Sequence, residues 1–257
     1  MLPVAAGEAG PLFTVVTVTF NAESLIDGTA ASLRQQGFED YEWLVVDGAS
    51  RDQTLGRVEA SGITRRRVVS EPDKGIYDAM NKAVRLARGR WIYFLNAGDA
   101  LADPDVLADV ARTIRQQPRA ELIWGDMRFI GPGRDDHMRY GHVGRTTLPF
   151  EDLNHQAAFA RRDLFQRLGH FNLAFRTSAD YDWFLRVFRS GAATHYVPRV
   201  IGRFDVGGMH TLDPQALARE RHQLRLQYVS PALLAVGLQV ARVRRRWRLW
   251  RMAAQAR

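Results

Sequence analysis

The sequence predicts an α/β fold in which a mostly parallel sheet is flanked by helices. Two observations predict it. Short β-branched runs alternate along the chain with segments of helical apolar periodicity. The first run, Phe13–Thr19, is β-branched or apolar at every position, as in strands buried on both faces of a parallel sheet. The 257 residues, 46% of them hydrophobic, suffice for one such domain with a buried core.

The pattern places most elements before residue 190. Strands are expected at Phe13–Thr19, Glu42–Val46, Arg67–Ser70, Trp91–Leu95 and Leu122–Trp124. Helices are expected at Ser24–Gln36, Asp52–Ala60, Ile76–Arg88, Pro104–Gln117, Asp163–Leu168 and around Tyr181–Phe188. The segment Gly125–Pro149 has weak periodicity and is expected to be a β-ribbon or a mobile loop. The alternation predicts parallel strands joined by right-handed crossovers.

Composition excludes several classes of protein. The chain has no cysteine, which rules out disulfides, thiolate metal sites and a cysteine nucleophile. Seven arginines and no acid lie in residues 242–257, so most of the net charge of +8 belongs to the tail. The rest of the chain is nearly neutral, and nucleic acid is not the expected partner. No apolar run is long enough to cross a bilayer, and the first residues lack the basic region of a signal peptide.

Polar loops follow the first four predicted strands. Ligands of open α/β sheets bind beyond the carboxyl ends of the strands, which selects four loops as a candidate site. These loops are Thr19–Glu23, Asp47–Asp52, Glu71–Gly75 and Asn96–Asp99. The chain has no phosphate-binding G-x-x-x-x-G-K, no G-x-G-x-x-G after the first strand, no G-x-S-x-G and no H-E-x-x-H. P-loop, dinucleotide, serine-hydrolase and zinc-protease chemistry are therefore poorly supported.

Five motifs follow one another in a characteristic order: V-T-V-T-F-N, V-V-D-G-A-S-R-D-Q-T, S-E-P-D-K-G-I-Y-D-A-M-N-K-A, W-I-Y-F-L-N-A-G-D and S-A-D-Y-D-W-F. With them the sequence resembles glycosyltransferase family 2 over about residues 13–210. It is most similar to the bacterial branch that builds capsule, exopolysaccharide and lipopolysaccharide. The resemblance implies a GT-A fold of Rossmann-like type, a nucleoside-diphosphate sugar donor and transfer with inversion. It divides the chain into an extension (1–12), a catalytic domain (13–212) and a basic helical tail (213–257).

The resemblance assigns the first three loops to the donor. Thr19, Asn21 and Asp47 are expected to hold the base and ribose, with Ser50 and Asp52 beside them. A carboxylate suits this role because it accepts hydrogen bonds from ribose hydroxyls. Alternatively, Asp47-Gly48 and Ser50-x-Asp52 only form a turn and cap the following helix.

Lys74 precedes a predicted helix N-terminus, and together they suit a diphosphate. The resemblance also assigns Asp78 and Asn81 to the donor sugar, although both also suit a solvated helix face.

The fourth loop departs from the family's metal-binding D-x-D pattern. Asn96 stands where the first acid is usual, which leaves Asp99 as the strong oxygen ligand. Mg²⁺ or Mn²⁺ is still expected, bound by Asp99, the Asn96 amide oxygen, donor phosphates and water, with His210 as a further candidate. A capping loop without metal is the alternative.

Asp180 falls where the family has its catalytic base. A carboxylate there would take the proton of the acceptor hydroxyl as the oxygen attacks. The alternative is helix capping, a role for which Asp182 is the better candidate. Asn154-His155-Gln156 resembles an element that borders the acceptor, although His155 is equally well explained as a buried core residue.

The expected activity is transfer of a hexose-type sugar to a saccharide acceptor, lipid-linked, in surface polysaccharide synthesis. Two alternatives remain: a non-catalytic or partner-dependent nucleotide-sugar-binding homologue, suggested by Asn96, and a nucleic-acid-binding protein that uses the arginine tail. In the tail, tryptophans and arginines interleave with apolar residues, which is typical of a helix lying on an anionic membrane. The protein is therefore expected in the cytoplasm, peripheral on the inner face of the cell membrane. Alternatively, the apolar half of the tail packs on the catalytic domain or on a second subunit, and the arginines are only solvated.

Overall fold

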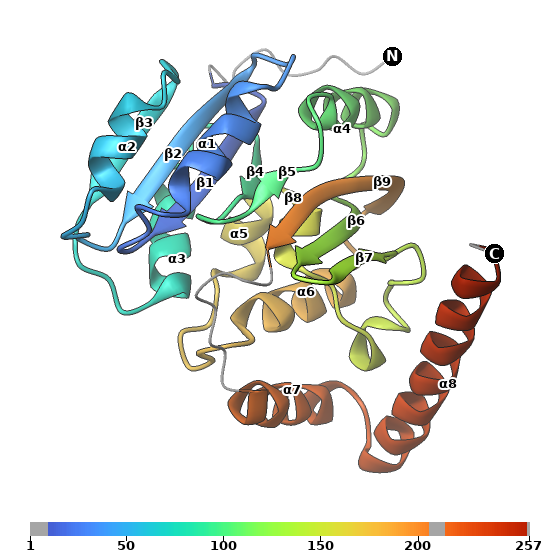
Figure 1. The fold of residues 1–257 in the computed structure, drawn as a ribbon. Helices are drawn as coiled ribbons and strands as arrows, with labels where there is room; N and C mark the ends of the chain where they lie inside the picture. The colour runs from blue at the N-terminus through green and yellow to red at the C-terminus, as the bar shows by residue number, and fades with distance from the viewer. Residues whose placement is uncertain (1–9, 206–213, 256–257) are drawn as a thin grey trace.

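The computed structural model describes residues 10–205 and 214–255. Its centre is a curved nine-stranded sheet with the order β3-β2-β1-β4-β8-β6-β9-β5, and β7 pairs with β6 (Figure 1). The strands are β1 (Phe13–Thr19), β2 (Tyr41–Asp47), β3 (Arg66–Ser70), β4 (Trp91–Phe94), β5 (Ala100–Leu101), β6 (Leu122–Gly131), β7 (Arg134–Met138), β8 (Ala158–Arg161) and β9 (Thr194–Asp205).

Helices cover both faces of the sheet. They are α1 (Ile26–Arg34), α2 (Thr54–Ala60), α3 (Ile76–Leu86), α4 (Val106–Gln116), α5 (Arg162–Leu168), α6 (Ala179–Ser190), α7 (Pro214–Tyr228) and α8 (Pro231–Gln255), with short 3₁₀ turns η1 (Leu148–Phe150) and η2 (His155–Ala157). One apolar core lies between the sheet and α1, α2 and α4. A second core lies between the sheet and α3, α5 and α6.

The predicted α/β class is confirmed, and the sheet is mixed. The pairs β1–β2, β2–β3, β1–β4 and β6–β9 are parallel, and the other four pairs are antiparallel. Strands β5, β8 and β9 were not predicted from the sequence. Strand β9 contains Pro198 and Gly202, which weaken a strand pattern, and its register shifts near Pro198 at a bulge against β6. The predicted ribbon in Gly125–Pro149 is the β6–β7 hairpin.

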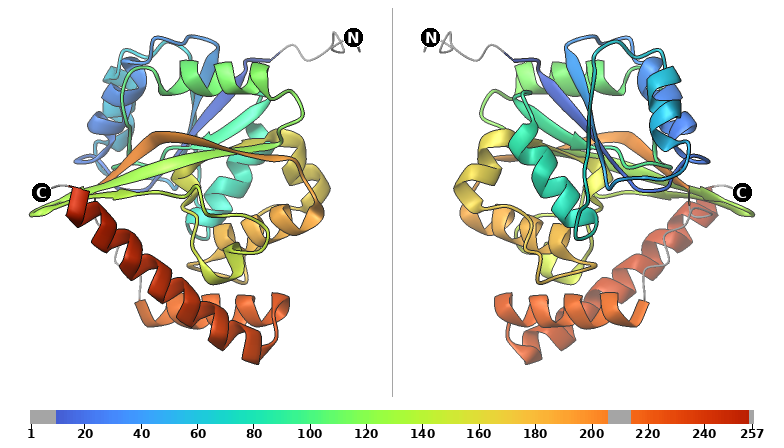
Figure 2. Two further views of the ribbon diagram at one scale, coloured as in Figure 1. Left: turned by 90° about the vertical axis from the view of Figure 1, so that its right-hand side faces the viewer. Right: turned by 90° about the vertical axis from the view of Figure 1, so that its left-hand side faces the viewer.

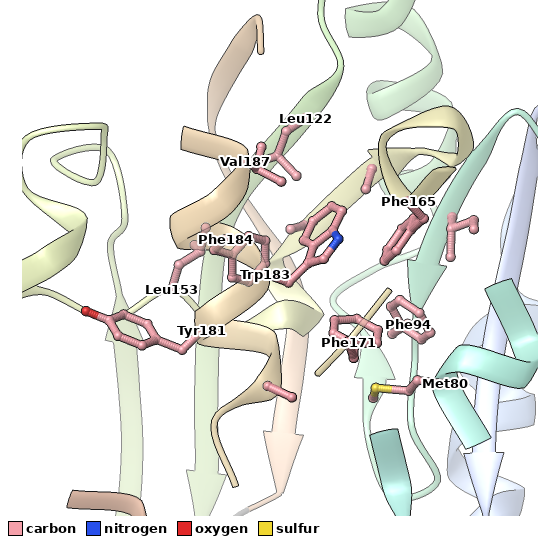
Figure 3. Packing of buried hydrophobic residues seen from close by; sticks show 14 of the residues in the cluster. Met80, Phe94, Leu122, Leu153, Phe165, Phe171, Tyr181, Trp183, Phe184 and Val187 are labelled. Atoms are coloured by element: carbon pink, nitrogen blue, oxygen red, sulfur yellow. The ribbon is translucent and has the colours of Figure 1, made fainter. Parts of the chain in front are cut away.

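The second core fixes the position of α6. Trp183 stacks on Phe165 of α5 with ring centroids 4.3 Å apart, and Phe184 and Val187 are also buried (Figure 3). Burial of large aromatic side chains is among the strongest stabilising contributions to a core. The first turn of α6 is therefore held rigidly against the rest of the domain.

Helices α7 and α8 form a V on the side of the sheet that carries α6 (Figure 2). Glu220 of α7 accepts hydrogen bonds from the backbone N–H groups of Arg176 and Thr177, at 2.8 and 2.9 Å, and so braces the loop before α6. Within the described residues no single helix has the length and hydropathy to cross a membrane. Only α7 and α8 up to Arg244 pass that test together, as a pair bent by 119°.

Candidate active site

The carboxyl ends of β1, β2, β3 and β4 meet at one edge because these strands are parallel neighbours. The loops that follow them are tightly packed. A Cβ atom at Gly48 would lie 2.6 Å from Asp73 Oδ2 and 3.3 Å from the Phe20 ring, so a larger residue would require the Asp73 side chain to move. Phe20 itself is 60% exposed at this edge.

Asp47 is fully buried at the end of β2. Its carboxylate accepts hydrogen bonds from Ser50 N at 2.9 Å, from Ser70 Oγ at 2.6 Å and from Ser50 Oγ. The structure thus brings Asp47 and Ser50 together, but Asp47 has no exposed surface. In this conformation it organises the loop, and direct contact with a donor stays a prediction.

Asn21, Ser50 and Asp52 join the first loop to the second. Asn21 N donates to Ser50 Oγ at 2.8 Å, and Glu23 N donates to Asp52 Oδ2 at 3.1 Å. Asn21 has a φ of 47°, a left-handed conformation that asparagine tolerates. Asp52 Oδ1 also accepts from Thr54 N at the start of α2, at 3.0 Å. The capping interpretation of Asp52 therefore describes its contacts in this structure.

The N-terminus of α3 opens at the same edge. Lys74 is exposed, and its backbone N–H donates to Asp78 Oδ2 at 3.0 Å. Gly75 has a φ of 114°, which other residues rarely adopt, and it starts the eleven-residue helix. The backbone N–H groups of Lys74, Gly75 and Asp78 have acceptors in this structure. The positive end of the helix dipole and the cationic Lys74 side chain together still suit a phosphate.

Asn81 lies one turn after Asp78 in α3. It is 5% exposed, and its amide pairs with the backbone of Phe171 in both directions, at 2.9 Å each. In this structure Asn81 holds the segment before α6, and contact with a donor sugar stays a prediction.

Asp180, in the first turn of α6, is the centre of a hydrogen-bond network. Its Oδ1 accepts from Tyr77 Oη and from Tyr181 N, at 2.8 Å each, and its Oδ2 lies 2.9 Å from His155 Nδ1. The opposite ring nitrogen, His155 Nε2, lies 3.0 Å from Asn96 Nδ2. The network joins α3, η2, the loop after β4 and α6.

The charge of Asp180 follows from this network. Burial alone would raise the pKa of the carboxyl group. The hydrogen bonds from His155 and Tyr77, together with the positive charges of His155 and Arg221, outweigh burial and lower the pKa below its ordinary value. Asp180 is therefore a carboxylate at neutral pH, held in one orientation by donors on both oxygens.

The amide of Asn96 faces the far side of the His155 ring, with Asn96 Nδ2 3.0 Å from His155 Nε2. Asn96 Oδ1 is left buried without a partner. Six buried side-chain polar atoms of the described residues lack one, and the three oxygens among them belong to Thr19, Asn96 and Gln156. Unpaired buried oxygens are costly, and these three lie at or beside the ends of β1 and β4.

The residues around Asn96 do not form a complete cation site. The described part of the chain has no group of three or more His, Asp or Glu side chains arranged to hold a metal ion. Asp99 is 2% exposed and accepts a hydrogen bond from Gln156 Nε2 at 2.8 Å. The metal role of Asp99 stays a prediction, and His210 lies outside the described residues.

Sequence reasoning did not single out Tyr77 or the contact between Gln156 and Asp99. Tyr77 is 103 positions from Asp180 and lies in the helix that was recognised by its apolar stripe. Nothing in the local pattern distinguishes its hydroxyl from that of a core tyrosine. His155 was left open between a core and a substrate role, and the structure makes it a neighbour of Asp180.

Comparison with known proteins identifies the family to which the chain belongs. Residues 14–184 match the family described as Glycosyl transferase family 2. Since the match spans more than half of the chain, the protein belongs to glycosyltransferase family 2, and it is a glycosyltransferase.

The relatives place the chain more closely. It is 34% identical over 227 residues to the PGL/p-HBAD biosynthesis glycosyltransferase of Mycobacterium tuberculosis, covering 85% of this chain and 87% of that one. The fold resembles that of S. aureus TarS 1–349 (TM-score 0.69, 18% identity, 88% of this chain and 69% of that one). It also resembles the mannosyltransferase PcManGT from Pyrobaculum calidifontis, solved with GDP-Man and Mn²⁺ (TM-score 0.63, 21% identity, 96% of this chain and 81% of that one). The capsule and lipopolysaccharide branch is not confirmed, because this relative acts in PGL/p-HBAD biosynthesis.

Proposed function

We propose that the protein transfers a sugar from a nucleoside diphosphate to a saccharide acceptor, with inversion at the anomeric carbon and with Asp180 as general base. The observation that carries the proposal is the Asp180 carboxylate, kept ionised and oriented by His155 and Tyr77. It belongs to the site framed by the carboxyl ends of the parallel strands, where this fold class binds ligands.

The reaction needs one proton transfer and one displacement. Asp180 accepts the proton of the acceptor hydroxyl while that oxygen attacks the anomeric carbon opposite the departing diphosphate. No covalent intermediate forms. His155 and Tyr77 hold the carboxylate in one orientation, so it needs little rearrangement when the acceptor binds.

The donor is assigned by chemistry and by analogy. The N-terminus of α3 and Lys74 offer positive potential to a diphosphate that gains charge as it leaves. A structure of TarS 1–349 holds UDP-GlcNAc, and the PcManGT structure holds GDP-Man, which supports a nucleotide-sugar donor here. Thr19 Oγ1 and Asn96 Oδ1 are buried without a hydrogen-bond partner beside this edge, and a small rearrangement on donor binding would let donor hydroxyls reach them. Asn96 and Asp99 do not by themselves complete a cation site, so the proposed mechanism assigns no step to a metal ion.

The acceptor is proposed to be a lipid-linked saccharide of a surface glycoconjugate. The mycobacterial relative is named for PGL/p-HBAD biosynthesis, which supports a glycoconjugate product without defining the linkage.

The testing experiment needs no acceptor. Purified protein is screened by thermal shift against UDP-, GDP- and dTDP-sugars, and the best donor is followed by proton NMR during slow hydrolysis. An α-linked donor should release the β-sugar first, because water then takes the place of the acceptor. Release of the α-sugar first would overturn the inverting mechanism. Absence of stabilisation by every nucleotide sugar would overturn the donor assignment.

A further inference from the structure

Helix α8 has one face that packs on the catalytic domain. Leu234 is 3% exposed, and the Phe150 ring lies so close to Gly237 that a Cβ atom there would be 2.2 Å from it. These two residues are three positions apart and fix which side of the helix is turned inward. The helix is therefore held in a defined orientation on η1, and its other faces are turned outward.

An apolar stripe runs along an outward side of α8. It consists of Leu233, Val236, Val240, Val243 and Trp247, which are 53%, 62%, 43%, 67% and 54% exposed. The spacings are three, four, three and four residues, which keeps all five on one side of a helix. Half of the ten exposed large apolar residues of the described chain are in this stripe. Such a concentration marks a surface that has a partner.

The charge beside the stripe selects the kind of partner. Residues 231–257 contain no Asp or Glu, and Arg242, Arg244 and Arg246 are exposed. In a pairing of two α8 helices through the stripe, Arg244 and Arg246 would occupy the flanking positions and face arginines of the second copy. Like charges at those positions oppose self-association, whereas an anionic surface satisfies them.

We propose that the apolar stripe of α8 binds the surface of an anionic phospholipid membrane. The apolar side chains enter the boundary between headgroups and acyl chains, Trp247 lies at headgroup level, and the arginines meet lipid phosphates. Each arginine near such a surface strengthens partitioning roughly fivefold, so three provide on the order of a hundredfold. The helix lies along the membrane and presents the catalytic domain to an acceptor embedded there.

This surface extends the proposed function without depending on it. The stripe shares no residue with the network around Asp180, so vesicle binding and donor hydrolysis can be measured independently. A protein that binds vesicles but hydrolyses no donor would contradict the proposed function only.

The test is flotation of the full-length protein with vesicles of phosphatidylcholine alone and of phosphatidylcholine with 30% phosphatidylglycerol. We expect binding to the anionic vesicles only, weakened by 0.5 M NaCl because salt screens exposed charges. Val236→Glu should lower partitioning at least about tenfold, since it removes a valine that inserts into the membrane and adds a charge at the headgroup boundary. Ala235→Glu is the matched control: it is exposed, adjacent and outside the stripe, and it should lower partitioning less than about threefold.

Three results would overturn the proposal. One is failure of the parent to float with anionic vesicles at low salt, which would leave an acidic protein as the occupant of the stripe. Another is equal binding by parent and Val236→Glu. The third is a dimer in sedimentation velocity, without lipid, that Val236→Glu dissociates, because the stripe would then be occupied by a second copy. Equal melting temperatures of the two glutamate variants exclude unfolding as the cause of any loss.

Discussion

Replacement of His155 by alanine tests how the carboxylate of Asp180 is kept ionised. In the parent, hydrogen bonds from His155 and Tyr77 overcome burial and hold the pKa of Asp180 below its ordinary value. His155 and Asp180 are 14% and 13% exposed at their side chains, so solvent replaces the lost bond poorly. A hydrogen bond to a charged group contributes about 1.5–3 kcal/mol, so its loss strongly disfavours the ionised carboxyl group. His155→Ala should therefore raise the pKa of Asp180.

The sign of the effect on rate follows from the role of the base. Transfer requires ionised Asp180, so its rate falls as pH drops through the pKa of that group. The acid limb of kcat/KM in His155→Ala should move to higher pH than in the parent, so the loss of rate should be smaller near pH 8 than at acidic pH. The free energy of unfolding of the parent should also depend on pH. A carboxylate whose pKa is lowered in the folded state stabilises the fold above pH of about 4, and this contribution is lost as the pH falls.

The assay is the pH profile of donor hydrolysis for parent, His155→Ala and a control. His137→Ala is a matched control, because His137 Nε2 lies 2.9 Å from Asp126 Oδ2 in a second histidine–aspartate pair, between β6 and β7. Its profile should superimpose on that of the parent. An unshifted acid limb in folded His155→Ala would refute the reasoning.

Three further predictions concern the other predicted site residues. Asn81→Ala should lower the free energy of unfolding by about 2–4 kcal/mol, because both backbone groups of Phe171 lose their partners. The Kd for UDP should not change. Calorimetry measures both quantities, and weaker UDP binding with unaltered stability would contradict this prediction. Asn96→Asp should tighten Mn²⁺ binding in the presence of UDP, since it replaces the buried, unpaired amide oxygen by a carboxylate. Water-proton relaxation measures the Mn²⁺ concentration at half-saturation. An unchanged value would show that no cation approaches residue 96. Asp47→Asn should weaken UDP binding about tenfold in titration calorimetry, because it disrupts the hydrogen bonds from Ser50 and Ser70. Ser70→Ala removes only one of these hydrogen bonds and should weaken UDP binding less. Equal losses in the two variants would mean that the Ser70 contact accounts for the whole role of Asp47.

The parallel half of the sheet was predictable because local pattern and tertiary role agree there. Phe13–Thr19 is β-branched and is buried at every position, and α3 shows its apolar stripe in the sequence and its packing in the core. The antiparallel half was not, because its strands are short or interrupted. Strand β8 has four residues, and β9 contains a proline and a bulge. Their pairing comes from neighbouring strands rather than from their own pattern.

The candidate site divides in the same way. The loops after β1, β2 and β4 and the first turn of α6 were located by motif and by strand ends. The contacts of Asp180 were not, because Tyr77 and His155 reach it only through the packing of α6 on α5 and of the Phe171 segment on α3. The contact of Asn81 with Phe171 was not predictable either, because the two residues are 90 positions apart in the sequence.

The central claim is that Asp180 removes the acceptor proton. Asp180→Asn keeps the shape of the side chain and removes its basicity, and Asp163→Asn changes a first-turn acid of α5 as a control. Donor affinity by calorimetry and single-turnover hydrolysis by NMR are measured on the same samples. We expect Asp180→Asn to retain the donor Kd within about threefold and to lose at least about 10²-fold in rate, with Asp163→Asn equal to the parent. A rate for Asp180→Asn comparable to that of the parent would contradict the account.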